Sequence, residues 1–144
     1  MKYLSGKITD TIVSGEEVVL TGSFKVVILA GRKVIIIGHG RLDALLCEEC
    51  IVVSQGGPVS IGTLLAGTAI ISGGRHPVFI KTLRAAKKGF LYRSIVGTCN
   101  ARDIYISAMV SIGALNASGE IVFFDPHSYV SRFEGDFSKV KISY

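Results

Sequence analysis

The sequence predicts an all-β protein, a right-handed parallel β-helix with three short strands in each coil of about 16–19 residues. The composition is the first observation behind this prediction. Of 144 residues, 49% are hydrophobic, and 17 are glycine while only 3 are proline. Short valine and isoleucine runs divided by glycine are typical of brief strands joined by tight turns. The chain is long and apolar enough to bury one continuous core.

The second observation is an internal repeat. Residues 59–64 read VSIGTL, and residues 110–115 read VSIGAL. The two segments lie 51 residues apart, which equals three periods of 17. A fixed period of this size is the signature of a solenoid, in which each coil buries its apolar face against the next coil.

Three interleaved apolar series follow a period near 17. The first consists of triplets that begin at Val18, Val34, Ile51, Ala69, Ile104, Ile121 and Val140, with one weak coil near residues 87–92. The second comprises Val26, Leu42, Val59, Val78, Ile95, Val110 and Val130, and the third Val13, Leu29, Leu45, Leu64, Leu83, Cys99, Leu115 and Phe137. Three series predict three strands per coil, and seven to eight coils predict a rod about 35–40 Å long.

A β-sandwich or β-barrel is the alternative fold. Its two-residue hairpins favour Asn-Gly or Asp-Gly, and the sequence contains neither dipeptide. We therefore expect one β-helix domain over residues 1–144 with an irregular insertion near residues 75–93. Within that insertion, residues 81–89 (KTLRAAKKG) have the composition of a short helix that ends at a glycine.

The candidate catalytic and metal-binding residues do not form the patterns that are typical of an enzyme. Cys47 and Cys50 form a Cys-x-x-Cys pair, but a zinc site needs four ligands, and there is no second pair. We interpret the two cysteines as small core residues beside an acidic turn. The other residues of types that bind zinc are Cys99, His39, His76 and His127. No spacing gathers two carboxylates, and neither glycine pair continues into a phosphate-binding loop. We expect no catalytic residues, no cofactor and no metal.

The formal net charge of +5 admits an anionic partner. Six basic residues are close in sequence, with Phe90 and Tyr92 between them: Arg75, Lys81, Arg84, Lys87, Lys88 and Arg93. They could contact an anionic membrane surface or, as a weaker expectation, nucleic acid. They could equally protect a strand face from aggregation. The sequence has neither a membrane-spanning apolar run nor a secretory signal, so we expect a cytoplasmic protein, with membrane association as a further option.

The C-terminal part carries a family pattern. Residues 134–142 read EGDFSKVKI, a Gly-x-apolar element followed by V-x-I, and residues 113–117 with 121–123 form a looser copy. This pattern resembles the bactofilins, polymer-forming cytoskeletal proteins of bacteria. The resemblance implies a three-sided right-handed β-helix that polymerises end to end without nucleotide and scaffolds other proteins at a membrane.

Open strand edges at the ends of a β-helix favour the same outcome, because unpaired strands template pairing with another molecule. We expect the self-assembly surface at Phe133, Phe137, Val140 and Ile142, although Phe133 and Phe137 could instead plug the end of the core. Two other functions stay open: a monomeric or dimeric interaction module that binds an anionic partner, and a small acyltransferase-like β-helix enzyme.

Overall fold

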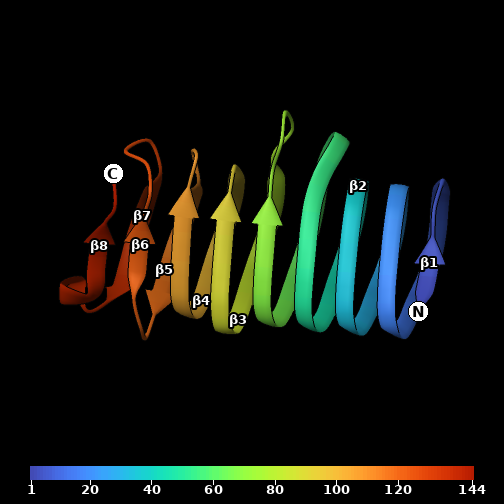
Figure 1. The fold of residues 1–144 in the computed structure, drawn as a ribbon, viewed down its shortest axis with the longest axis horizontal. Helices are drawn as coiled ribbons and strands as arrows, with labels where there is room; N and C mark the ends of the chain where they lie inside the picture. The colour runs from blue at the N-terminus through green and yellow to red at the C-terminus, as the bar shows by residue number, and fades with distance from the viewer.

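The computed structural model describes residues 1–144 and confirms the predicted fold class. The chain winds into a right-handed parallel β-solenoid of about 8 turns, with the termini at opposite ends of the rod (Figure 1). No segment forms a helix of the length and apolar character that crossing a membrane requires.

The strands follow one another around the rod with few interruptions. They are β1 (Lys2–Leu4), β2 (Lys7–Ser72), β3 (Val78–Tyr92), β4 (Ser94–Ser107), β5 (Ser111–Ala117), β6 (Ile121–Phe123), β7 (Tyr129–Gly135) and β8 (Val140–Ile142). A single 3₁₀ turn, η1 (Phe137–Lys139), precedes β8. Strand β2 is 66 residues long, because the chain stays paired with the neighbouring coils as it passes several corners.

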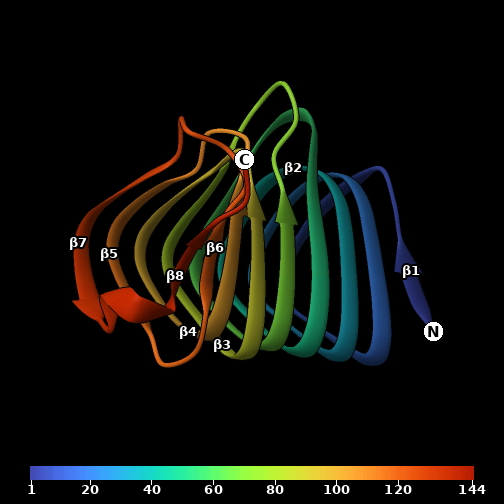
Figure 2. The same cartoon turned by 60° about the vertical axis from the view of Figure 1, so that its left-hand side comes forward.

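Every strand pair is parallel, which excludes the β-sandwich alternative. Strand β3 makes one full coil and shows how a coil is built. Its ladder with β4 runs in three stretches, residues 78–80, 82–85 and 88–92, separated by corners. We name these stretches and their equivalents in other coils side 1, side 2 and side 3. Figure 2 shows the coils stacked behind one another along the rod.

The core consists of inward-facing side chains stacked in register. On side 2, Leu64 pairs with Leu83, and the same ladder continues through Cys99, Leu115 and Phe133. One cluster contains 33 of the buried hydrophobic residues. Because each coil repeats the same inward positions, the apolar ladders run through the rod without a break.

One corner depends on the small size of glycine. Gly22 has a φ of +103°, and a Cβ there would lie 2.3 Å from the carbonyl oxygen of Gly6 in the preceding coil. Any other residue would have to adopt an unfavourable backbone conformation and displace that carbonyl. The corner therefore keeps two coils within hydrogen-bonding distance, and Ser23 donates its N–H to Gly6 at 2.9 Å.

Four details of the sequence prediction were wrong. Residues 81–89 are strand rather than helix, because Leu83 and Ala85 face the core between two paired coils. The structure near the predicted insertion is irregular at two places only, a loop at residues 73–77 and a register shift after Ala85. Ile95 points outward, since Ser94 and Val96 hold the buried positions beside it, and Phe133 rather than Phe137 continues the side 2 ladder.

Replacement of Leu83 by alanine tests the stacked core. Leu83 is fully buried, so Leu83→Ala should lower the free energy of unfolding by about 2–5 kcal/mol. The outward-facing neighbour Leu65 is 40% exposed, and Leu65→Ala should change it by less than about 0.5 kcal/mol. Urea denaturation followed by circular dichroism measures both values. Equal losses in the two variants would contradict the inward assignment of the ladder.

Candidate functional site

The two ends of the solenoid are the places where its sheet lacks a partner. Strand β1 pairs only with β2, while β7 pairs only with β5 and β8 only with β6. Each end strand therefore exposes a row of backbone N–H and C=O groups along the rod axis. Such edges bind further strands unless another element covers them.

The C-terminal end also contains an apolar hollow of about 300 Å³. It is lined by Leu115, Ile121, Phe123, Ser128, Tyr129, Val130, Phe133, Phe137 and Val140. Phe133 packs on the core, and its ring centroid lies 4.8 Å from that of Phe137 at an interplanar angle of 59°. The η1 turn buries none of its own residues, so it does not close this end.

The four residues predicted for self-assembly all lie at this end, although they differ in exposure. Phe133 and Val140 are half-buried against the core, and Phe137 and Ile142 are 75% and 66% exposed. Phe133 thus packs against the end of the core, whereas Phe137 is exposed to solvent. The sequence reasoning missed Phe123, Tyr129 and Val130, of which Phe123 and Val130 already belonged to the periodic series.

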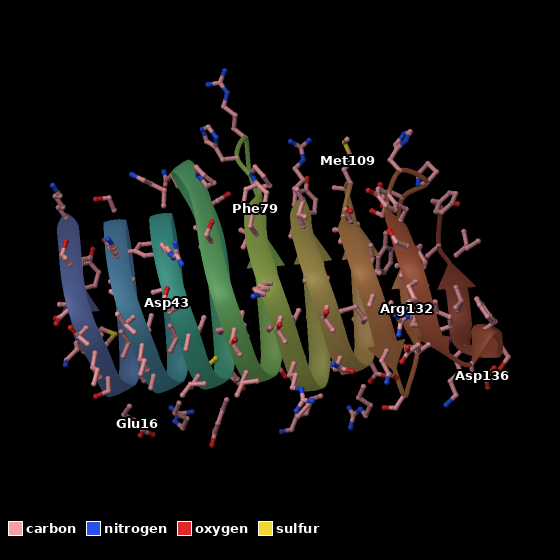
Figure 3. All side chains as sticks on the ribbon, turned by 180° about the vertical axis from the view of Figure 1, so that it is seen from behind. Glu16, Asp43, Phe79, Met109, Arg132 and Asp136 are labelled. Carbon is pink, nitrogen blue, oxygen red and sulfur yellow. The ribbon has the colours of Figure 1, made fainter.

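Polar contacts fix the shape of the end. Asp136 accepts hydrogen bonds from the Ser138 hydroxyl at 2.7 Å and from its backbone N–H at 2.9 Å, and these contacts lower the pKa of the Asp136 carboxyl. Figure 3 shows Asp136 at the tip of the rod and Arg132 nearby. Lys139 donates to the carbonyl of Ser118 at 2.8 Å, which ties η1 to the previous coil.

Strand β8 is held to the rod by a carboxylate. Glu120 accepts a hydrogen bond from the Tyr105 hydroxyl at 2.6 Å and forms an ion pair with Lys141 at 2.9 Å. These two contacts lower the pKa of Glu120, and the same hydrogen bond raises the pKa of Tyr105 to about 12. Side-chain contacts therefore hold the last coil in place together with its backbone pairing.

The six basic residues of the predicted anionic-partner patch do not gather on one side. They are Arg75, Lys81, Arg84, Lys87, Lys88 and Arg93, all exposed. Arg75 and Arg93 line one hollow at the corner between sides 3 and 1. Arg84 projects from side 2, Lys87 lies at the corner that leads to side 3, and Lys88 is the first residue of side 3. Because residues 75–93 encircle the rod, the six basic residues form a ring around it.

The cysteine pair lies at a corner of β2. Cys47 is half-buried and Cys50 is buried. Interaction with the Cys50 thiol lowers the pKa of Cys47, and interaction with Cys47 together with burial raises the pKa of Cys50. Burial alone raises the pKa of Cys99 to about 12. No group of three or more histidine, cysteine or acidic side chains gathers in a geometry that could hold a metal ion.

The histidines make local contacts. His39 places Nδ1 3.2 Å from the carbonyl oxygen of Gln55, one coil further on. His76 lies in the loop at residues 73–77, where its carbonyl accepts hydrogen bonds from the Ser54 hydroxyl and the Gly74 N–H. His127 belongs to a turn organised by Asp125. Each histidine lies in a different part of the rod.

Comparison with known proteins finds no match. No family profile matches the chain, and neither a curated protein nor a solved structure is similar to it.

The cysteine contacts predict an order of chemical reactivity. The thiolate is the reactive form, so the lowered pKa and partial exposure of Cys47 should make it the first site of iodoacetamide labelling at pH 8. Cys50 and Cys99 should react only after denaturation. Mass spectrometry of labelled peptides measures the order, and Cys47→Ser should remove the native-state signal. Labelling of Cys99 as fast as Cys47 in the folded protein would contradict the assignment.

Proposed function

We propose that this protein is a structural, self-associating scaffold whose solenoids stack end to end into filaments without nucleotide. The observation that carries the proposal is the pair of open sheet edges at opposite ends of one rod. Two complementary edges on one molecule generate a heterologous contact, and a heterologous contact that does not close gives an open filament.

The register of the end strands supports head-to-tail stacking. Strands β1 and β8 both lie on side 3, because β1 pairs with residues 18–20 and β8 continues the ladder from β4 through β6. A second copy placed on the C-terminal end would add its β1 beside β8 as the next rung. Leu4 of the incoming copy would then lie over Ile142, and the hollow beside Phe137 would be covered.

The apolar hollow gives this contact a hydrophobic component. Backbone pairing alone contributes little net free energy, because the free edge is hydrogen-bonded to water. Covering Phe133, Phe137 and Val140 removes apolar surface from water, which contributes roughly 25 cal/mol for each Å². The end face is thus better suited to association than an edge with polar side chains.

Membership of the bactofilin family is part of the proposal, supported by the three-sided solenoid and by the pattern at residues 134–142. In this role the partner of the protein is first of all itself. The ring of basic residues within residues 75–93 would face outward along a filament, where an anionic membrane surface or scaffolded proteins could contact it. We propose a structural rather than an enzymatic function, carried out in the cytoplasm.

Negative-stain electron microscopy of the purified, tag-free protein at physiological salt tests end-to-end stacking. The wild-type protein should form filaments a single rod wide or paired, without added nucleotide. Phe137→Arg should abolish them, because it places a charge in the hollow that the next copy must cover.

Met109→Arg provides the matched control. Met109 is 65% exposed on a corner of the rod, as Figure 3 shows, and it does not line the C-terminal hollow, so its replacement should leave filaments intact. Small particles alone for the wild-type protein at high concentration, or filaments unaffected by Phe137→Arg, would refute stacking through this end.

A further inference from the structure

Side 3 carries a row of outward-facing apolar residues that runs along the rod. Its members, one from each successive coil, are Tyr3, Val19, Ile35, Ile51, Ile70, Phe90 and Tyr105, and Val122 continues the row in a buried position. Within β2 the register follows from two glycine contacts. Gly38 lies against the carbonyl of Gly22, 16 residues earlier, and Gly67 against that of Glu48, 19 residues earlier.

This row lies on an open surface. The strands of side 3 face the viewer in Figure 1, and the loop at residues 73–77 rises from the corner instead of crossing them. Ile70 is 39% exposed, and the exposed ring of Phe90 stacks on Tyr105 with centroids 4.8 Å apart. A contiguous apolar row of this length on a strand face is typical of an interaction surface.

A second row, two positions earlier in each coil, consists mostly of charged residues. In order along the rod it contains Glu17, Lys33, Glu49, Thr68, Lys88, Asp103 and Glu120. One hollow touches Lys33, Glu49 and Thr68 together, which places these three consecutive members side by side. The sign of the charge changes along the row, so the row can complement a reversed copy of itself.

We propose that side 3 binds side 3 of a second copy of this chain, with the two rods antiparallel and a two-fold axis at the coil of Ile70. In this arrangement Lys33 lies opposite Asp103 of the second copy, and Glu49 lies opposite Lys88 of the second copy. The symmetry doubles both ion pairs. In the apolar row, Ile70 meets its own equivalent and Ile51 meets Phe90.

The charges select this register over its neighbours. A shift by one coil in one direction sets Lys33 against Lys88, and a shift in the other direction sets Glu49 against Asp103. Like charges directly opposite one another are destabilising. In the proposed register the like pair is Glu17 with Glu120, near the ends of the contact, and each has a cation of its own chain: Arg32 at 3.2 Å and Lys141 at 2.9 Å.

The size of the surface is sufficient for a specific dimer. Seven coils at about 4.8 Å and strands of about five residues at 3.3 Å give roughly 500 Å² on each copy. The pair then buries on the order of 1,000 Å², the lower limit for a stable biological interface. This lateral contact goes beyond end-to-end stacking and does not require it, because it uses a side of the rod.

Sedimentation analysis of Phe137→Arg, in which the ends are blocked, tests the lateral contact. This variant should have about twice the chain mass of 15.4 kDa. Adding Ile70→Lys should give monomers, because two lysines would meet at the axis. Adding Ile95→Lys should leave dimers, since Ile95 is similarly exposed, at 43%, on side 1.

A charge exchange tests the register. In the same background, Glu49→Lys should weaken dimerisation about tenfold or more, and Lys88→Glu added to it should restore the dimer, because the pair is only inverted. A monomeric Phe137→Arg protein, equal effects of Ile70→Lys and Ile95→Lys, or no rescue by the exchange would overturn the proposal.

Chemical cross-linking separates this proposal from end-to-end stacking. Facing sheets lie about 10 Å apart, so a short bismaleimide can join two copies of Ile70→Cys across the axis. Both Ile70→Cys and the control Ile95→Cys also carry Cys47→Ser to remove the accessible native thiol. Cross-linked dimers with Ile70→Cys alone support the lateral contact even if Phe137→Arg still forms filaments, a result that would refute only the stacking proposal. Equal or absent cross-linking refutes the lateral contact.

Discussion

Parallel hydrogen bonding between successive coils is the interaction on which the rest of this structure depends. Of 104 backbone–backbone hydrogen bonds, 94 lie within the strands, and each coil bonds only to the coils before and after it. This pairing holds the coils about 4.8 Å apart and so brings equivalent side chains into contact, which builds the leucine ladder through Leu64, Leu83 and Leu115. The same interaction leaves the first and last coils with one partner missing. The stability of the rod and the open edges at its ends therefore have one physical cause.

The sequence allowed the solenoid to be predicted because the inward positions repeat chemically. Triplets such as Ile104–Ile106 and Ile121–Phe123 were identified from spacing alone, and the structure pairs them residue by residue. The exact register was harder to predict, because corners accept extra residues without disturbing the sides. The loop at residues 73–77 and the shift after Ala85 change the coil length, so an average period of 17 drifts away from the true partners. Ile95 was placed in the core for this reason.

The helix predicted at residues 81–89 was wrong because it was inferred from local sequence alone. Alanine, leucine, lysine and arginine favour a helix in isolation, but Leu83 and Ala85 alternate with exposed residues and are held by paired coils on both sides. Basic residues that are close in sequence spread around the circumference, because one coil takes them through a full turn. In a solenoid, surface patches instead consist of residues one coil apart, such as Ile51, Ile70 and Phe90. The same rule explains why the hollow at the C-terminal end combines residues from three strands.

The two proposed directions of association, through the ends and through side 3, are perpendicular to each other and rest on different physics. Contact through an end adds a strand to a sheet, so backbone geometry dictates its register and few sequences could change it. Contact through side 3 uses side chains only, so its register depends on apolar matching and on charges such as Lys33 and Glu49. Salt weakens exposed ion pairs but hardly affects backbone pairing, and thus ionic strength acts on the lateral direction alone. In the proposed assembly, end-to-end stacking would stay constant while the pairing of neighbouring rods would respond to substitution of a few surface residues.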